Sequence, residues 1–406
     1  MTLPHLSPRC NELIVAEPTT PVEASRHANV RIILTLTLIH FSGDFYNAFV
    51  TPLLPLFVDK FALTLAQAGL ITGVSRFLAF VIQPQVGYLA DRHPSRHFPL
   101  LGLLVVTVFI SLTGVAPSFW LLLLFISLGS IGSSMFHPTA AGMISDFAGR
   151  HVGFSLSVFN MGGTLAFAVG PLFISWQVSN FGLQSMPWAI AIGLVMVAIL
   201  YRTLPAPPDT GLGGQSLLGS IKATFGAVWK PIVLIWLVMA LRAFVSQSFM
   251  TFLPVLYAQE GYSLMSLGAM ISLYTVAGAL SGLLAGHLSD RIGFKSIFLV
   301  FHTLSVPSIY LLLSAPGKWV YPCAFLAGFF LLATLPLGVA LAQKLAPRGK
   351  SMASSLMTGL AFGTGGLLTP LTGKLADMYS LRPVLSALAV IPLVTVVLIG
   401  FLPKKT

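Results

Sequence analysis

GYLADR at residues 87–92 is followed much later in the chain by GHLSDR at residues 286–291. The two hexapeptides are offset by 199 residues, counted from Asp91 to Asp290. Two proline pairs recur at the same offset, Pro55 with Pro254 and Pro171 with Pro370. Several matches at one spacing, each at the same place in its half, predict an internal repeat. We therefore expect two similar structural units.

The composition places this repeat in a membrane. Hydrophobic residues make up 56% of the chain and charged residues 8%, and the mean hydropathy is +0.90. A soluble domain carries about 25% charged residues, so only a bilayer can solvate this much apolar surface from outside. The net charge of +11 would suit a nucleic-acid partner. However, the basic residues stand in gaps between apolar runs, so we expect no nucleic acid.

Apolar runs long enough to cross about 30 Å of hydrocarbon recur along the chain. We predict an all-α membrane protein with twelve transmembrane helices in two six-helix, pseudo-symmetric bundles. The predicted units are a cytoplasmic tail (1–30), a first bundle (31–204), a cytoplasmic linker (205–229) and a second bundle (230–403). The expected spans are 31–58, 65–90, 98–116, 118–145, 151–177, 184–204, 230–258, 264–288, 294–314, 317–343, 350–376 and 382–403.

The orientation follows from the basic residues. An even number of spans puts both termini on one side, and most lysines and arginines fall on that side. Only Lys60, Lys318, Lys374 and Arg382 fall on the other. The positive-inside rule then predicts cytoplasmic termini and a multi-pass protein of the cell (inner) membrane. Residues 1–28 contain no apolar stretch, so we expect a polar tail rather than a cleaved signal peptide.

Residues 87–96 resemble the signature of the major facilitator superfamily between its second and third helices, with Pro94 where the family usually has glycine. The resemblance covers residues 30–403. A narrower resemblance is to the fosmidomycin-resistance group of bacterial drug exporters, and three segments carry it: His40-x-x-x-Asp44, residues 83–88 and residues 132–138. It implies the major facilitator fold, a small-molecule substrate and export. Thr139 and Arg76 depart from that group's pattern.

Asp44 is the only acid well inside a predicted span, and charges in hydrocarbon are functional candidates by default. A carboxylate in a cavity can carry a proton whose affinity changes as the cavity opens to either side. His40 lies one helical turn before Asp44 on the same face, and His137 could also relay a proton. We predict proton coupling by Asp44, His40 and His137. Static pairing of Asp44 with an arginine, and helix–helix hydrogen bonds from the histidines, are the structural alternatives.

Arg76 and Arg242 also lie inside predicted spans, and two guanidiniums against one carboxylate leave a cavity positive. The repeat offset makes Arg242 equivalent to Gly43, so we expect Arg242 and Asp44 at similar depths on either side of the cavity. A planar guanidinium suits phosphate, phosphonate or carboxylate oxygens, which predicts an anionic substrate. Alternatively, one arginine is neutralised by Asp44 and the other reaches an interface. The further predicted substrate-binding residues are Tyr46, Gln83, Asn160 and Gln247.

The repeated hexapeptides place an acid at the cytoplasmic ends of the second and eighth spans. Such an acid can meet the positive N-terminus of a helix from the other half and hold the cytoplasmic side shut. The superfamily resemblance implies that Asp91 faces the start of the eleventh span and that Arg92 pairs with Asp146. We predict a cytoplasmic gate; a topology signal alone is the alternative. Its residues are Asp91, Arg92, Asp146, Asp290 and Arg291.

The sequence contains no phosphate-cradling loop, metal-ligand cluster or nucleophile–base pair, so we predict neither an enzyme nor a cofactor or metal. Transport energy should then come from an ion gradient. We predict a monomeric, proton-coupled exporter of a small anionic compound or drug, working by alternating access in the lipid bilayer. A proton-coupled importer or facilitator of organic anions is the second hypothesis. A membrane sensor or scaffold is the third, and it would need an output domain that the tail and linker do not offer.

Overall fold

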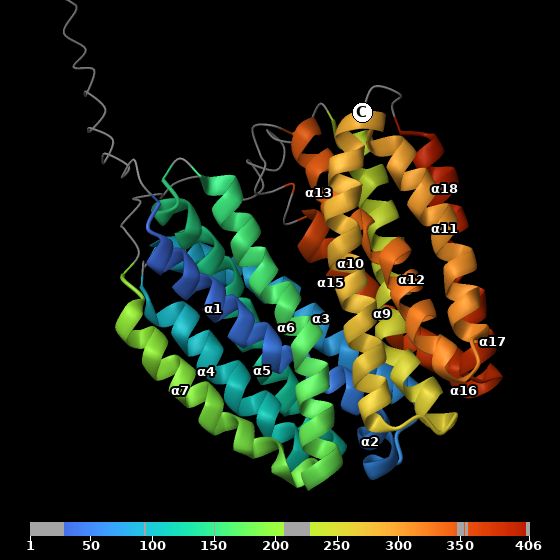
Figure 1. Ribbon diagram of the computed structural model, residues 1–406, viewed down its shortest axis with the longest axis horizontal. Coiled ribbons are helices and arrows are strands. Elements are labelled where there is room, and N and C mark those ends of the chain that lie inside the picture. The colour runs from blue at the N-terminus through green and yellow to red at the C-terminus, as the bar shows by residue number, and fades with distance from the viewer. Residues whose placement is uncertain are drawn as a thin grey trace, which may run out of the picture.

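The computed structural model describes residues 28–92, 95–149, 151–206, 228–346, 353 and 356–402. Helices account for the regular structure of all these segments, and they form two bundles that stand side by side (Figure 1). The first bundle contains α1 to α7 and the second α9 to α18. The predicted class, an all-α protein of two six-helix units, is confirmed.

The first bundle follows the predicted spans within a few residues. Short 3₁₀ segments at Thr113–Val115 and Leu183–Trp188 precede α5 and α7. Its helices are α1 (Val30–Asn47), α2 (Val50–Phe61), α3 (Leu65–Arg92), α4 (His97–Leu112), α5 (Phe119–Phe147), α6 (Val152–Phe181) and α7 (Ala189–Thr203).

The second bundle repeats this order with more interruptions. A 3₁₀ turn at Gly317–Trp319 precedes α12, and a π-helical turn at Leu356–Leu360 precedes α15. Its helices are α9 (Trp229–Gln259), α10 (Leu264–Ile292), α11 (Phe294–Ser314), α12 (Val320–Leu332), α13 (Thr334–Leu345), α15 (Ala361–Leu367), α16 (Thr369–Tyr379), α17 (Leu381–Leu388) and α18 (Ile391–Gly400).

Ten helical segments of the described chain are long and apolar enough to cross a membrane. Two of these ten, the tenth and twelfth predicted spans, are interrupted at Ala333 and between α17 and α18. The first and eleventh predicted spans are not among the ten and are broken between α1 and α2 and between α15 and α16. A proline follows each of these last two breaks, Pro52 or Pro370. Proline has no N–H for the carbonyl four residues earlier, and its ring clashes with that carbonyl. These two breaks therefore follow from the sequence, although we predicted single helices there.

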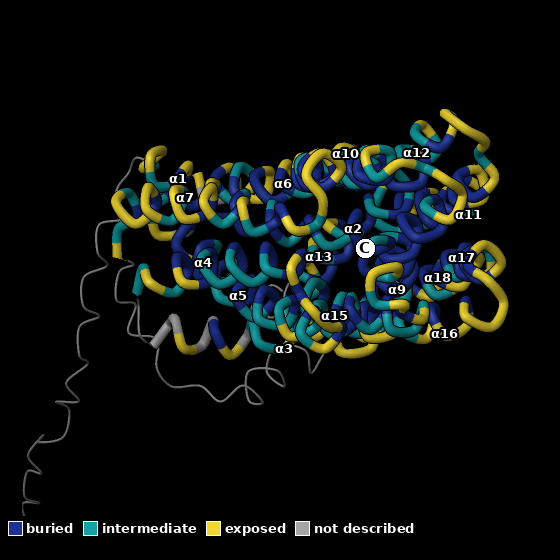
Figure 2. Tube along the Cα trace, turned by 90° about the horizontal axis from the view of Figure 1, so that it is seen from below, coloured by how far each residue is buried: buried dark blue, intermediate teal, exposed yellow. Residues whose placement is uncertain are grey.

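Apolar side chains cover the outside of both bundles. Trp120, Leu283 and Val397 are among many large hydrophobic residues that are exposed. Figure 2 shows exposed residues on the outer faces and buried residues gathered inside the bundles. Such a surface is stable only against lipid, which agrees with a multi-pass membrane protein.

Two matching crossings join the bundles, and both use a glycine. A Cβ on Gly69 of α3 would lie 2.6 Å from the carbonyl oxygen of Thr369, beside Pro370. A Cβ on Gly268 of α10 would lie 2.7 Å from the carbonyl oxygen of Pro171. These pairs are related by the 199-residue offset, so the sequence repeat is also a repeat of the interface. Only glycine lets the backbones approach this closely.

We name the side where α1 begins and α18 ends the terminal face, and the opposite side the far face (Figure 1). The hydrophobic core of the first bundle continues into the second through far-face residues such as Phe252 and Leu385. Second-bundle residues nearer the terminal face, such as Ile235 and Leu341, belong to a separate cluster. The two bundles therefore share a core towards the far face.

Candidate functional site

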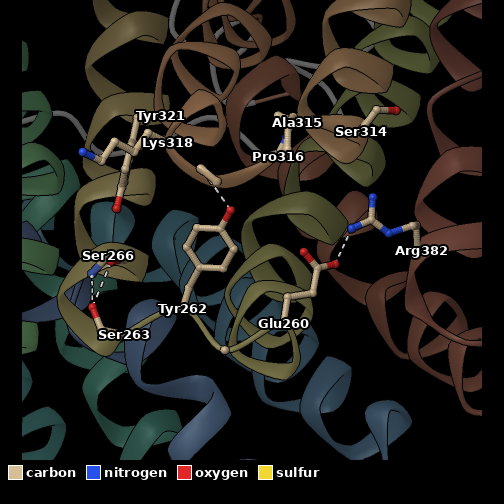
Figure 3. A pocket seen from close by; sticks show the side chains of 12 residues that line it. Glu260, Tyr262, Ser263, Ser266, Ser314, Ala315, Pro316, Lys318, Tyr321 and Arg382 are labelled. Atoms are coloured by element: carbon tan, nitrogen blue, oxygen red, sulfur yellow. Dashed lines mark hydrogen bonds and ion pairs between the residues drawn. The ribbon is translucent and has the colours of Figure 1, made fainter.

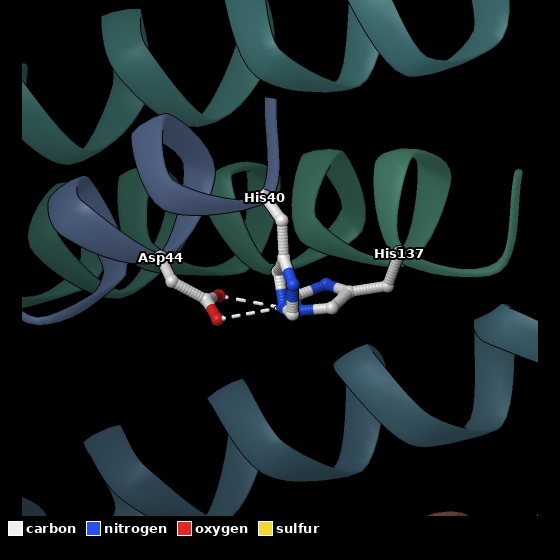
Figure 4. A group of neighbouring side chains, drawn as sticks. All are labelled: His40, Asp44 and His137. Atoms are coloured by element: carbon white, nitrogen blue, oxygen red, sulfur yellow. Dashed lines mark ion pairs between the residues drawn. The ribbon is translucent and has the colours of Figure 1, made fainter. Parts of the chain in front are cut away.

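Asp44 forms the centre of a buried polar cluster in the first bundle (Figure 4). Its carboxylate Oδ2 lies 3.1 Å from Nε2 of His40, and its Oδ1 lies 3.1 Å from Nε2 of His137. Asp44 is only 4% exposed. His40 and Asp44 come from successive turns of α1, while His137 comes from α5. The structure thus brings together the three residues that we predicted for proton coupling.

Backbone carbonyls hold both imidazole rings. Nδ1 of His40 lies 2.8 Å from the carbonyl oxygen of Phe159, and Nδ1 of His137 lies 2.9 Å from that of Ser133. A carbonyl oxygen only accepts hydrogen bonds, so each Nδ1 must carry the hydrogen. The Nε2 of a neutral ring would then turn a lone pair towards the Asp44 carboxylate, which is repulsive. The two contacts with Asp44 are attractive when the imidazoles are protonated.

Three neighbours support the cluster, and we did not predict any of them as site residues. Asn47 donates from Nδ2 to Oγ of Ser133 at 3.0 Å and to Oδ1 of Asp44 at 3.4 Å. A Cβ on Gly163 of α6 would lie 2.6 Å from Nε2 of His40 and 2.7 Å from Oδ2 of Asp44. The spacing of Asn47, one turn after Asp44, could have revealed it. The Gly162–Gly163 pair is a local sign of close helix packing, but which residues Gly163 meets depends on where α6 packs.

Arg76 lies close to this cluster on α3. A Cβ added to Gly366 of α15 would lie 2.5 Å from the Cβ of Arg76, so the stem of Arg76 packs directly against this glycine. Its charge interacts electrostatically with Asp44 and with His137. The side chain is half-buried, and among the described residues no hydrogen bond or ion pair engages its guanidinium. Arg76 is therefore a cation at the edge of the cluster that is available to a ligand.

Arg242 lies deep in the second bundle instead. It is 1% exposed. Nε donates to the carbonyl oxygen of Leu331 at 3.1 Å, and Nη2 donates to that of Leu332 at 3.2 Å. Neither arginine makes an ion pair with Asp44 within the described part of the chain, so the static Asp44–arginine pair is not what the structure shows. The expectation that Arg242 and Asp44 lie at similar depths on either side of the cavity stays a prediction.

The other predicted substrate-binding residues are scattered. Tyr46 is buried and donates its hydroxyl to the carbonyl oxygen of Ala189 at 2.7 Å, a contact between α1 and α7. Gln247 is buried in α9, Gln83 is half-buried in α3, and Asn160 is exposed on α6. Arg76 is the member of this set whose charge acts on the cluster, and roles in binding for the others remain predictions.

The predicted cytoplasmic gate lies largely outside the described residues. The side chains of Asp91, Arg92 and Asp290 and the segment 347–352 are not described, while Asp146 and Arg291 are exposed. Partial shielding from water by the neighbouring chain raises the pKa of the Asp146 carboxyl slightly above its ordinary range, although the residue is exposed. The pairing of Arg92 with Asp146 therefore stays a prediction.

The far face carries a polar contact between the bundles that we did not predict. Asp377 of α16 accepts hydrogen bonds from the backbone N–H groups of Leu65 at 2.8 Å and Ala66 at 3.0 Å. A carboxylate at the first turn of α3 satisfies free donors and the helix dipole together. Nearby, Thr251 donates to Oγ1 of Thr72 at 2.9 Å. These hydrogen bonds hold the two bundles together at the far face, and we call the contact of Asp377 with the start of α3 the latch.

A pocket of about 690 Å³ opens at the far face of the second bundle (Figure 3). Lys318, Tyr321 and Ser266 are among its lining residues. Tyr262 donates its hydroxyl to the carbonyl oxygen of Gly317 at 2.9 Å, and Glu260 forms an ion pair with Arg382. The Asp44 cluster belongs to the first bundle and has no residue in this pocket.

The Asp44 cluster is also the set of described residues whose atom types could hold a metal ion, with donor atoms within 4.8 Å of one another. Two imidazole nitrogens and a carboxylate oxygen suit zinc-like ions. Protons on Nε2 account for the same contacts without an ion.

Comparisons with known proteins agree with this architecture. The family model described as Major Facilitator Superfamily matches residues 36–351. The fosmidomycin resistance protein of Escherichia coli K12 is 26% identical over 382 residues, which cover 92% of this chain and 93% of that protein. Multidrug resistance protein MdtG of Klebsiella pneumoniae is 27% identical over 270 residues, 63% of this chain and 65% of that protein.

Solved structures share the fold at low sequence identity. A bacterial homolog of the human lysosomal transporter Spinster, in an inward-facing and unoccupied conformation, matches with a TM-score of 0.78 and 19% identity, covering 91% of this chain and 95% of that one. The human organic anion transporter MFSD10 matches with a TM-score of 0.67 and 16% identity, covering 91% and 99%. At these identities the likeness concerns the fold.

Proposed function

Because the chain belongs to the Major Facilitator Superfamily and is a membrane transporter, we propose that it is a proton-coupled exporter of a small anionic compound. The observation that carries the proposal is the cluster of Asp44, His40 and His137. Related resistance proteins in bacteria support export and a drug-like substrate. We place it in the inner membrane, with cytoplasmic termini, as a monomer.

The cluster supplies a physical link between protons and helix positions. With protons on both Nε2 atoms, Asp44 attracts His40 on its own helix and His137 on α5. When these protons leave, the lone pairs of the two rings face the carboxylate and the contact between α1 and α5 weakens. Loading and release of protons thereby favour different arrangements of the bundle, as alternating access requires.

Arg76 supplies the substrate contact in this proposal. It is half-buried, free of an ion pair within the described residues, and close enough to interact with Asp44 and His137. A phosphonate or carboxylate group would accept paired hydrogen bonds from its guanidinium. Any acidic compound that reaches the cluster would therefore be held by a permanent cation beside the proton site.

The same electrostatics favours a second candidate, a proton-coupled importer of organic anions. Protonated His137 and Arg76 are both positive, so a bound anion would stabilise the protons and the protons would stabilise the anion. Such mutual stabilisation is the linkage expected when proton and anion move together. An antiporter needs a conformational step that separates the two binding events.

Two measurements test these proposals. In proteoliposomes with an imposed pH gradient, Asp44→Asn should abolish proton-driven flux of fosmidomycin, the first compound to try, while leaving the folded protein intact. Asp59→Asn, a change outside the cluster, serves as the matched control. Full proton-driven flux in Asp44→Asn would refute the assignment. Everted vesicles expose the cytoplasmic face to the outside, and their lumen is made acidic relative to the outside. Uptake of the compound into these vesicles then indicates export, whereas loss of preloaded compound indicates import.

A further inference from the structure

Arg242 poses an electrostatic problem that the transport proposal does not solve. It is the largest of the fully buried side chains and lies in the middle of α9. A buried charge in a membrane protein needs a partner of opposite charge or a polar cavity. Within the described residues the ion pairs formed by acids are those of Asp44 and Glu260, and neither involves Arg242.

Neutral groups solvate one edge of the guanidinium. The carbonyl oxygens of Leu331 and Leu332 accept from Nε and Nη2 because the helix is interrupted at Ala333, between α12 and α13. Pro336 has no N–H for the carbonyl of Leu332, four residues earlier, and so leaves it free. The ring of Phe362 lies 5.6 Å from the guanidinium carbon. These contacts reduce the cost of burial but leave the charge uncompensated.

Three buried hydrogen-bond donors around this part of the second bundle lack acceptors. Nη1 of Arg242, the hydroxyl of Tyr274 and the hydroxyl of Thr334 are buried without a partner in the described structure. Tyr274 is 0% and Thr334 is 1% exposed. A Cβ on Gly328 of α12, one turn before the two carbonyls that Arg242 binds, would touch the backbone of Tyr274, and Thr334 begins α13 directly after those carbonyls. Buried polar atoms in native proteins nearly always have a partner.

We propose that Arg242, Tyr274 and Thr334 bind a small monovalent inorganic anion of the halide type inside the second bundle. One negative charge balances one guanidinium, and a single acceptor between α9, α10 and α13 would satisfy all three donors. Near-complete burial of these residues favours a monatomic ion over a bulky organic anion. This site goes beyond the transport proposal, because it shares no residue with the Asp44 cluster.

His302 is the remaining titratable side chain that interacts with Arg242. Its Nδ1 lies 2.9 Å from the carbonyl oxygen of Phe298, so Nδ1 donates and Nε2 of the neutral ring is an acceptor. His302 is therefore not part of the donor set for the anion. An ordered water could satisfy donors and acceptors alike, but it would not balance the charge of Arg242.

The test is the thermal stability of the purified full-length protein in sodium chloride or sodium bromide against sodium gluconate at equal ionic strength. A ligand that binds only the folded protein raises the melting temperature as its concentration rises. We expect a saturable rise with both halides and none with gluconate. In Tyr274→Phe and Thr334→Val the half-saturating halide concentration should rise about tenfold, since each variant removes one donor.

Tyr257→Phe is the matched control, because the Tyr257 hydroxyl is equally buried but already donates to the carbonyl oxygen of Leu312. This variant should melt at a lower temperature yet keep the wild-type halide response. Equal responses in halide and gluconate would overturn the proposal and favour water. An unchanged halide response in Tyr274→Phe and Thr334→Val would also overturn it. Asp44→Asn should keep the response, so failure of the transport proposal is seen separately.

Discussion

The Asp44 cluster of the first bundle and the surroundings of Arg242 in the second bundle occupy equivalent places in the repeat, but they differ in the charged groups that they contain. By the 199-residue offset, Gly43 corresponds to Arg242 and Ser133 corresponds to Leu332. In the first bundle Nδ1 of His137 lies 2.9 Å from the carbonyl oxygen of Ser133. In the second, Nη2 of Arg242 lies 3.2 Å from that of Leu332. The repeat thus presents the same carbonyl to a histidine in one half and to an arginine in the other.

This difference separates a group that can change charge from one that cannot. Histidine titrates near physiological pH, whereas a guanidinium stays protonated. In our proposal the first bundle therefore supplies the proton switch, and the second has a permanent charge that must be balanced. At the position of His137 the second half has Pro336, which breaks the helix and frees the carbonyl that Arg242 binds.

Of the substitutions outside the three side chains of the Asp44 cluster, Gly163→Ala should have the largest effect. The added Cβ would press on Nε2 of His40 and Oδ2 of Asp44, so the cluster could not close. We expect proton-driven flux to fall by at least about 100-fold, the usual scale of a lost proton-transfer group. Proteoliposome transport measures it. Gly142→Ala is the control, since nothing lies within 4 Å of its Cβ position. Equal flux in the two variants would contradict a role for the cluster.

A second comparison sets Arg76→Gln against Arg242→Gln. Arg76 is accessible beside the cluster, whereas Arg242 is buried behind helix carbonyls. We expect Arg76→Gln to weaken binding of an anionic substrate by about tenfold or more, the value of one charged hydrogen bond. Arg242→Gln should change it far less. Calorimetric titration of both variants checks this, and the reverse order would move the substrate site into the second bundle.

The latch at the far face should have a moderate effect. Asp377→Asn keeps the shape of the side chain but removes the charge that meets the first turn of α3. The loss of such a cap costs about 1 kcal/mol, so the equilibrium should shift towards states that are open at the far face. Distances between spin labels on α3 and α16 would report this shift. No change in their distribution would mean that the packing at Gly69 holds the face shut alone.

The smallest effect should come from Glu260→Gln, which breaks the ion pair with Arg382. This pair is partly exposed to water, where screening limits its value to less than about 1 kcal/mol. We expect a melting temperature within a few degrees of wild type and unchanged transport. A large loss of transport would give the pocket beside Glu260 a role that the Asp44 cluster does not explain.

Much of the architecture of this molecule could be predicted from the sequence. Hydropathy and the 199-residue offset determined the helical spans, the class and the repeat, because these depend on residues close in the chain or on a simple period. The pairing of His40 with Asp44 was equally accessible, since residues four apart share a helix face. The breaks before Pro52 and Pro370 were also readable, though we predicted single helices there.

Only the tertiary structure decided which partners these residues meet. His137 joins Asp44 because α5 packs against α1, and Arg242 binds carbonyls of α12 rather than an acid in the other half. The need for glycine at position 163 and the latch from Asp377 to α3 arise in the same way. Such contacts join residues far apart in the chain, so no local pattern determines them. The sequence by itself determined the scaffold and the charged groups, and the packing of the helices decided which of those charges can act together.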